Sequence, residues 1–376
     1  MLEKVKALRR ELHTYPELSG QEVETARRIR EFIKTHHDTK IIEELGGTGV
    51  AAIYEYEEQG PTVMIRCELD ALPIAEPNAF NYKSTSEGVS HKCGHDGHMA
   101  MVAGLIFWLR TQTNLKGKVI LLFQPAEETG RGAEAVLKDP RFSKLQPDYI
   151  FALHNIPGAP MHQIIPIQNN FSPAVQSIAI YLNGKVSHAC EPERGINPAL
   201  AISKIVTAFE DLNIRDPKDE DFTLFTPVYI TMGEVAYGIS AGTGEVHYTF
   251  RTWKEDRMTE LKTKINQILE NVSISEGITC TIDWFDYFPA SINNNFCNEI
   301  VIKSAKQNGF YIQENAQPFK FGEDFGWFSQ DHQVAMFGLG SGIDTPALHH
   351  ADYDFPEELL ETGMQMFKGI IKELLS

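Results

Sequence analysis

The fold is indicated most directly by residues 119–133, which read VILLFQPAEETGRGA. Five successive apolar residues, Val119 to Phe123, are typical of a strand buried on both faces, as the strands of a parallel sheet are. A polar turn follows, and a helical pattern begins at Gly132. Because a strand, a turn and a helix in this order form half of a βαβ unit, we expect an α/β layer architecture.

Three further apolar runs have the same character: Thr62 to Ile65, Tyr149 to Leu153 and Val334 to Leu339. A helical segment, Gly97 to Arg110, lies between the first of these and the strand at Val119. This alternation predicts a mostly parallel sheet with right-handed crossovers.

A different pattern begins after about Ser172. Strand candidates with alternating or short apolar runs are followed by amphipathic helices in the order βαββαβ, which is typical of a compact α+β domain. The segments are Val175 to Leu182, Pro198 to Leu212, Val228 to Met232, Val246 to Trp253, Arg257 to Val272 and Ile278 to Phe285. Because the buried-strand pattern resumes near Val334, we predict one domain from residues 1–172 and 289–376, with residues 173–288 inserted as a second domain.

The composition narrows the class of partner. The chain has 376 residues, 42% of them hydrophobic and 23% charged, as in an ordinary globular protein. Its formal net charge of -17 argues against nucleic acid and anionic membranes as partners, because both require clustered Lys and Arg. A small polar ligand is the simpler expectation. Five cysteines lie singly, with no C-x-x-C, which argues against a disulfide framework or a structural zinc ribbon.

The N-terminus predicts no targeting segment. Met1 to Arg10 has no long apolar core and reads as the start of an amphipathic helix. The longest apolar stretch, Met99 to Leu109, is too short to cross a bilayer. We therefore expect a soluble, cytoplasmic protein.

Residues 91–98, HKCGHDGH, place three imidazoles, a thiol and a carboxylate directly before an apolar helix. One interpretation is a polar loop that caps this helix, with Asp96 as the N-cap acceptor. In the other, Cys93 and His95 lie two residues apart on an extended stretch, so both side chains point the same way and can reach one metal ion.

Polar residues also follow each predicted parallel strand. In strand order they are Glu68 and Asp70, then Glu127 and Glu128, then His154, and then His349 and His350. Because the carboxyl ends of parallel strands share one sheet edge, these residues are expected to converge there.

The candidate metal ligands are Cys93, His95, Glu128, His154 and one of His349 or His350. Five protein ligands are too many for one catalytic zinc ion but suit two metal ions that share a bridge. Mixed thiolate, imidazole and carboxylate donors favour zinc, with manganese, cobalt and nickel as alternatives. Glu127, beside Glu128 but able to point elsewhere, is the candidate general base.

Seven stretches together resemble the aminoacylase and hippurate-hydrolase branch of the co-catalytic zinc peptidases. They are residues 13–17 (HTYPE), 70–73 (DALP), 93–98 (CGHDGH), 124–133 (QPAEETGRGA), 152–157 (ALHNIP), 186–189 (VSHA) and 348–355 (LHHADYDF). They occur in the family's order and cover nearly the whole chain.

The resemblance implies a di-metal peptidase catalytic domain with an inserted lid that mediates homodimerisation. It assigns the ligands as Cys93, His95, Glu128, His154 and His349, and it gives Glu127 the role of base and Asp70 that of orienting the site. His98 and His350 match positions that are not ligands. Lid residue His188 would stabilise the oxyanion, and Arg251 would pair with a substrate carboxylate. The implied activity is that of a metallo-amidohydrolase: metal-bound hydroxide attacks the amide bond of N-acyl, for example N-acetyl, amino acids.

The chain departs from the family pattern at two places. Residues 237–241 read YGISA where the lid usually carries an Asn followed shortly by Ile-Pro, and Glu68 replaces an Asp. One alternative function is that of a dipeptidase or carboxypeptidase of the same family, which would need a carboxylate for the free α-amine. The other is a non-catalytic metal-binding scaffold, which the presence of Glu127 beside all five ligands disfavours.

Overall fold

A computed structural model describes residues 1–376, and the chain folds into two compact units. The first unit comprises residues 1–171, 291–317 and 323–376, and the second comprises residues 172–290 and 318–322.

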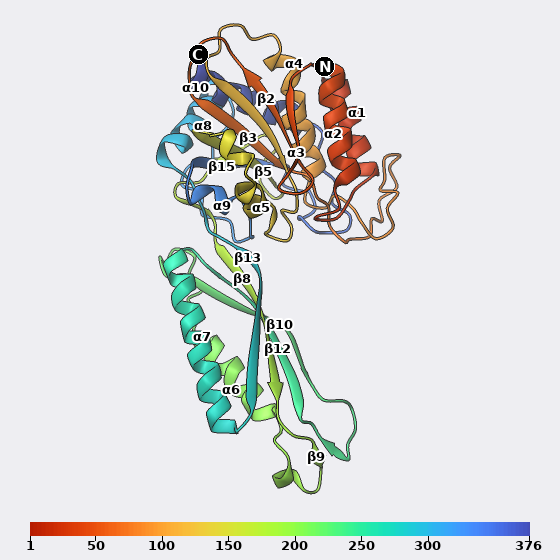
Figure 1. Ribbon diagram of the computed structural model, residues 1–376, viewed down its shortest axis with the longest axis vertical. Helices are drawn as coiled ribbons and strands as arrows, with labels where there is room; N and C mark the ends of the chain where they lie inside the picture. Colours follow the sequence, from red (N-terminus) through yellow and green to blue (C-terminus); the bar gives the residue numbers. More distant parts are fainter. The chain divides into compact units, whose positions relative to one another are not determined.

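The first unit is built on a seven-stranded sheet with the order β1-β2-β4-β3-β5-β15-β6 (Figure 1). Its centre is formed by β4 (Lys118–Gln124), β3 (Thr62–Glu68), β5 (Tyr149–Ile156) and β15 (Gln333–Gly340), which are parallel to one another. These are the four predicted strands, so the prediction of a mostly parallel sheet is confirmed. Their residues are almost all buried, which explains why their sequences are continuously apolar.

Antiparallel strands extend the sheet at both edges. β1 (Lys40–Leu45) and β2 (Gly49–Glu55) form a hairpin that pairs with β4, and β6 (Ile164–Pro166) pairs with β15. Sequence analysis did not predict the hairpin. Its turn contains Gly46 and Gly47, whose φ angles of 65° and 118° lie in the region that glycine adopts readily. Two short strands, β7 (Asn170–Ser172) and β14 (Ser291–Ile292), form a separate two-stranded sheet.

Helices pack against the large sheet. They are α1 (Leu2–Thr14), α2 (Val23–His36), α3 (His95–Gly104), α4 (Ile106–Leu109), α5 (Gly132–Lys138), α8 (Asn295–Gln307), α9 (Gly326–Ser329) and α10 (Leu359–Leu375), with a 3-10 turn at Phe142–Lys144. The helix predicted from Gly97 to Arg110 is thus two helices. Every residue of α3 is buried, and α3 contacts α1, α10 and β3. Gly97 in α3 allows this packing, because a Cβ there would lie 2.5 Å from the ring of Phe355. No helix is long and apolar enough to cross a membrane.

The second unit is a four-stranded antiparallel sheet packed against two helices. The strand order is β10 (Thr223–Met232), β12 (Thr243–Thr252), β8 (Ala174–Asn183) and β13 (Thr279–Phe288), and the helices are α6 (Ala199–Glu210) and α7 (Glu255–Glu276). The remaining elements are β9 (Ser187–His188), which pairs with β11 (Ile239–Ser240), and a 3-10 turn at Pro192–Arg194. Side chains such as Ile205, Phe250 and Ile265 form its core. The predicted βαββαβ order is present.

Candidate metal centre

The segment at residues 91–98 turns sharply rather than running extended. Gly94 has a left-handed φ of 93° and precedes His95, the first residue of α3. The extended stretch expected through Cys93 and His95 is therefore wrong, because the turn at Gly94 is what sets the directions of their side chains. Asp96 is not the helix cap either: it is buried in the first turn, where its Oδ2 lies 2.8 Å from both Arg9 Nε and His13 Nδ1.

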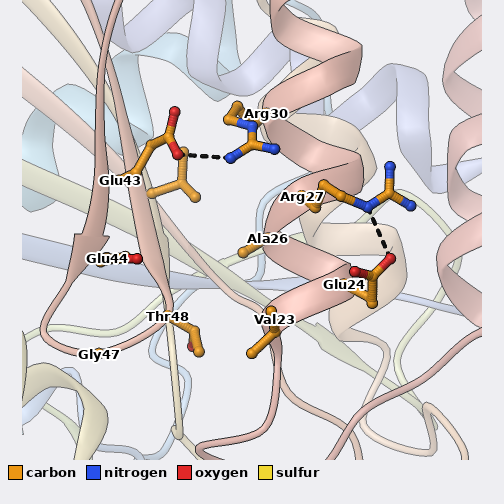
Figure 2. Close-up of a pocket in the computed structure, with 10 residues that line it drawn as sticks. Val23, Glu24, Ala26, Arg27, Arg30, Glu43, Glu44, Gly47 and Thr48 are labelled. Atoms are coloured by element: carbon orange, nitrogen blue, oxygen red, sulfur yellow. Dashed lines mark hydrogen bonds and ion pairs between the residues drawn. The ribbon is translucent and has the colours of Figure 1, made fainter.

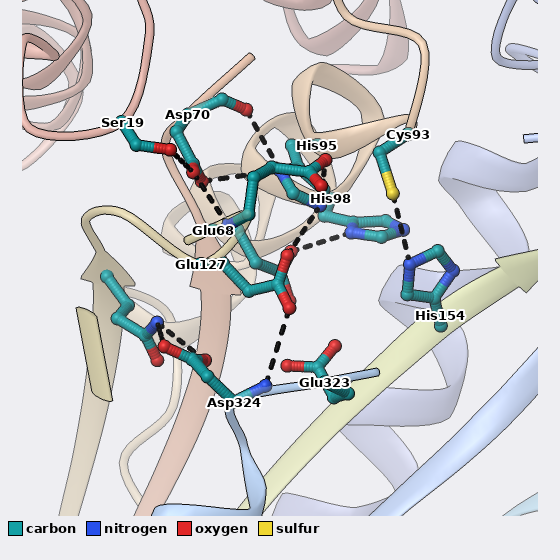
Figure 3. Close-up of polar contacts among 12 residues, drawn as sticks. Ser19, Glu68, Asp70, Cys93, His95, His98, Glu127, His154, Glu323 and Asp324 are labelled. Carbon is teal, nitrogen blue, oxygen red and sulfur yellow. Dashed lines mark hydrogen bonds and ion pairs between the residues drawn. The ribbon is translucent and has the colours of Figure 1, made fainter. Parts of the chain in front are cut away.

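The donor atoms of five predicted ligands gather into two groups that share one residue. Cys93, His95 and His154 form one group, and Cys93, Glu128 and His349 form the other, with the ligand atoms of each group within 4.8 Å of one another. Figure 3 shows the Cys93 thiol directed at the His154 ring, with 3.5 Å between Sγ and Nε2. His350 belongs to neither group. Two donor groups with a common sulfur suit two metal ions.

The Nδ1 atoms of His95 and His154 each donate a hydrogen bond to a backbone carbonyl. His95 Nδ1 donates to Asp70 O at 2.9 Å, and His154 Nδ1 donates to Asn155 O at 2.9 Å. Each bond fixes the ring and directs Nε2 inward, as in histidines that bind metal ions. His95 Nε2 and Glu128 Oε1 are buried without a hydrogen-bond partner, which is costly unless a cation occupies the space they face. The residues therefore fit divalent metal ions.

Asp70 links the two sides of this cluster. Its Oδ2 accepts hydrogen bonds from Ser19 Oγ at 2.7 Å and from Glu128 N at 2.9 Å, while its backbone oxygen holds His95. It is fully buried. Asp70 thus contacts both His95 and Glu128, and its role of orienting the site stays a prediction.

His349 is the most exposed member of the cluster. Half of its side chain is accessible, and its Nε2 lies 3.8 Å from Glu128 Oε2. Its φ of 66° is unusual for a residue with a side chain, and its amide donates to Lys92 O at 2.8 Å. The backbone bond to Lys92 attaches the His349 loop to the segment that carries Cys93.

Burial and clustered carboxylates shift the acid–base properties of these groups. Burial, with the charges of Glu323 and Glu128, raises the pKa of Glu127 well above its usual value. Burial, opposed in part by His95, raises the pKa of Glu128 to about 7. Burial also raises the pKa of the Cys93 thiol and lowers that of His154 to about 3. Glu128 and Cys93 therefore hold their protons more tightly than ordinary carboxyl and thiol groups do, whereas the ring of His154 resists protonation.

Glu127 lies at the edge of the cluster. Its Oε2 is 3.8 Å from His95 Nε2, and it forms a further potential ligand group with His95 and Glu128. Its Oε1 is directed at the backbone amide of Asp324, 3.4 Å away (Figure 3). It is therefore close enough to act on a molecule bound at the cluster.

Sequence analysis missed a buried ion network beneath the cluster. Arg66, fully buried on β3, contacts the carboxylates of Glu68, Glu323 and Asp324, the last two at 3.0 and 2.7 Å. Gln124 accepts from Arg66 Nε at 2.9 Å and donates to Asp324. A signal was present, because an arginine within a continuously apolar strand requires buried anions. The GEDF sequence at residues 322–325 supplies two of them.

His98 also belongs to this buried network. Its Nδ1 lies 2.7 Å from Glu68 Oε2, and its Nε2 lies 2.6 Å from Asn155 Oδ1. Glu68, His95 and His98 form another group with potential ligand atoms. Both ring nitrogens of His98 thus have protein partners, and Glu68, one of the two departures from the family pattern, bridges His98 and Arg66.

Two predicted site residues lie in the second unit. His188 is exposed at the end of β9, where its Nδ1 accepts a hydrogen bond from Cys190 N at 3.1 Å. Arg251 on β12 donates from Nε to Lys320 O at 3.0 Å. Their roles toward the cluster stay predictions. All five cysteines are free thiols, as the sequence pattern predicted.

A surface pocket of about 360 Å³ lies apart from the predicted site residues. Figure 2 shows it between α2 and the β1–β2 hairpin, flanked by the ion pair of Arg30 and Glu43. None of its lining residues is a predicted ligand or base.

Fold and donor cluster together define a metal-binding hydrolase, and comparison with known proteins gives its family. The model of peptidase family M20/M25/M40 matches residues 64–373. The chain is 30% identical to N-acetyl-L-cysteine deacetylase of Bacillus subtilis (strain 168), covering 98% of this chain and 87% of that protein. It is 27% identical to hippurate hydrolase of Campylobacter jejuni subsp. jejuni serotype O:2, covering 98% of this chain and 96% of that protein.

A solved structure gives the same result. The Bacillus subtilis YXEP protein, a dinuclear metal-binding peptidase of the M20 family, superposes with a TM-score of 0.84 at 26% identity, covering 99% of this chain and 98% of that chain. The chain belongs to peptidase family M20/M25/M40, and it is an amidohydrolase of that family.

Replacing Arg66 with Met should destabilise the first unit strongly. Removing the guanidinium leaves Glu68, Glu323 and Asp324 buried without it, at a cost of about 3 to 5 kcal/mol. Urea denaturation measures the loss. As a control, Arg30→Met removes a partly exposed surface pair with Glu43 and should cost less than about 1 kcal/mol. Equal losses in the two variants would contradict the importance of the buried network.

Metal affinity should rise with pH. Below pH 7, Glu128 is protonated in the metal-free protein because its pKa is raised to about 7, and the Cys93 thiol holds its proton higher still. Metal ions must displace these protons, so each displaced proton makes affinity fall about tenfold per pH unit of acidification. Competition with a chelator for zinc at pH 6, 7 and 8 measures this dependence. An affinity that does not change between pH 6 and 8 would show that neither group binds the metal.

Proposed function

We propose that this protein hydrolyses the amide bond of N-acyl amino acids, with N-acetyl amino acids as the first substrates to test. The observation that carries the proposal is the pair of donor groups sharing Cys93, with Glu127 beside them. The names of the relatives support the substrate class, since they include deacetylases of N-acetylcysteine and N-acetyldiaminopimelate and a hippurate hydrolase.

In this proposal Cys93, His95, His154, Glu128 and His349 hold two divalent ions, with zinc the preferred metal for such a mixed donor set. When bound, such ions polarise a carbonyl and lower the pKa of water. The thiol of Cys93 and the carboxyl of Glu128 bind as anions, and the imidazoles of His95 and His154 bind through Nε2. Asp70 holds His95 through its backbone oxygen and Glu128 through its carboxylate.

Glu127 is proposed as the group that moves the proton. Its carboxylate accepts a proton from the attacking water and gives it to the leaving amine. Burial and the charges of Glu323 and Glu128 raise the pKa of Glu127, so its carboxylate takes up a proton more readily than that of an ordinary glutamate. Two bound cations would oppose that rise, and the balance suits a residue that both accepts and donates.

The inserted segment, residues 173–288, is proposed to serve as lid and dimerisation domain. In this role His188 donates a hydrogen bond to the oxyanion that forms from the substrate carbonyl, and Arg251 pairs with the substrate carboxylate. The dimer proposal is supported by the outer strand β10, which has no partner strand on one side and exposes Val228, Tyr229, Ile230 and Met232. Such an apolar edge readily pairs with a second strand.

Glu127→Gln should abolish hydrolysis without changing metal content. The amide keeps the size of the side chain but cannot accept the proton, so kcat should fall by about 100-fold or more. The assay screens acetyl, benzoyl and succinyl amino acids, together with dipeptides, with added zinc, manganese or cobalt, and metal content is measured in both proteins. Wild-type turnover in the variant would exclude Glu127 as the base, and activity on dipeptides alone would exclude the N-acyl substrate class.

Ile230→Lys in β10 should convert a dimer into a monomer. A charge on the apolar edge opposes pairing with a second copy. Ile274→Lys on α7 is the matched control, because Ile274 is another exposed isoleucine of the same unit and lies away from this edge. Light scattering coupled to size exclusion measures the mass of each protein. A monomeric wild type, or a dimer that survives Ile230→Lys, would refute this interface.

A further inference from the structure

The turn that carries Glu127 has an unusual backbone. Ala126, directly before Glu127, has a φ of 49°, a left-handed conformation that residues with a side chain rarely adopt. Such a conformation persists only where surrounding contacts enforce it. The position of Glu127 therefore depends on whatever holds Ala126.

Three hydrogen bonds hold Ala126. Its carbonyl oxygen accepts from Gly132 N at 3.1 Å and from Thr129 Oγ at 3.3 Å, both a few residues further along the chain. On the other side, Ala126 N donates to Glu22 Oε1 at 2.8 Å, although Glu22 lies 104 residues earlier in the chain. The only side chain that contacts the Ala126 amide is thus that of Glu22.

Glu22 is itself fixed at several points. It is fully buried, its Oε1 also accepts from Gly20 N at 2.8 Å, and its Oε2 accepts from Thr48 Oγ at 2.7 Å. Thr48 lies in the β1–β2 hairpin and lines the pocket of Figure 2 opposite α2. The carboxylate therefore joins the start of α2, the hairpin and the turn before Glu127.

The loop at residues 17–22, which ends at Glu22, also contacts the cluster through Asp70. Ser19 Oγ donates to Asp70 Oδ2, the oxygen that also accepts from Glu128 N (Figure 3). At the start of this loop, Glu17 O accepts from Ala71 N at 2.8 Å. Residues 17–22 thus contact Ala126, directly before Glu127, and also residues 70 and 71, where the Asp70 carboxylate accepts from the amide of Glu128.

We propose that Glu22 is a positioning residue that sets the orientation of Glu127 by holding the left-handed turn at Ala126. The inference rests on the proposed role of Glu127 as base. What matters is the reach of the Glu22 oxygen to the Ala126 amide rather than its charge, because all its contacts are hydrogen bonds from neutral groups.

Three substitutions separate reach from charge. Glu22→Gln keeps the length and an oxygen acceptor, so kcat should stay within about threefold of wild type. Glu22→Asp keeps the charge but is about 1.5 Å shorter, and Glu22→Met keeps the length without an acceptor. Both should lower kcat, by about tenfold for Asp and up to about 100-fold for Met, because small displacements of a catalytic group cost that much. KM and metal content should remain those of wild type.

The matched control is Thr25→Val on the same helix. Thr25 is buried, like Glu22, and its Oγ donates a hydrogen bond to Glu17 Oε2 at 2.8 Å. Unlike Glu22, it has no hydrogen bond to the turn at Ala126. This variant should keep wild-type kcat whatever its melting temperature, which separates loss of stability from loss of positioning.

Combining Glu22→Met with Glu127→Gln tests whether Glu22 acts through Glu127. The residual rate of Glu127→Gln should fall no further in the double variant. Wild-type kcat in Glu22→Met, equal losses in Gln and Met, or loss of metal in proportion to activity would each overturn the inference. If Glu22→Met does not fold, the kcat values of the other two variants decide the question. A higher kcat in Glu22→Gln than in Glu22→Asp supports the inference, and the reverse order overturns it. Wild-type turnover in Glu127→Gln would instead refute the proposed base and leave the Glu22 contacts to be explained otherwise.

Discussion

The cluster at the carboxyl ends of the parallel strands depends on balancing buried negative charge. Glu68, Glu127, Glu323 and Asp324 are all buried within one small region. Carboxylates removed from water are tolerated only where cations or donors compensate them. From within the sheet, Arg66 contacts three of them. On the side where Cys93, His95 and Glu128 converge, the only ion-pair partners of Glu128 are the imidazoles of His95 and His349, and the divalent ions that we propose there would complete the charge balance.

Much of this arrangement could be predicted from the sequence, for a local reason. The strands β3, β4, β5 and β15 are buried on both faces, so their apolar runs are continuous and readable. Once four parallel strands are located, their shared edge places His154 and Glu128 near each other without further information. The grouping of Cys93 with His95 was expected too, although the expected backbone was wrong because glycine at position 94 allowed a turn.

What the sequence did not reveal depends on partners far apart in the chain. Arg66 contacts Glu323, 257 residues away, and Glu22 contacts Ala126, 104 residues away. Neither pair has a periodic or local signature. The β1–β2 hairpin was missed because β1 reads KIIEEL, which is not a continuous apolar run. His188 and Arg251 lie in the second unit, and their proposed roles toward a substrate stay predictions.

Sharing of Cys93 between the two donor groups has a consequence for how the proposed centre fills. A thiol must lose its proton before it can coordinate, and burial makes that loss unfavourable. In the proposed centre the first ion would bear this cost, and the second would meet a thiolate that already exists. Repulsion between two close cations would act in the opposite direction. Where the thiolate effect is larger, the protein would pass from empty to doubly loaded with little of the singly loaded form, and its activity would respond steeply to the free metal concentration.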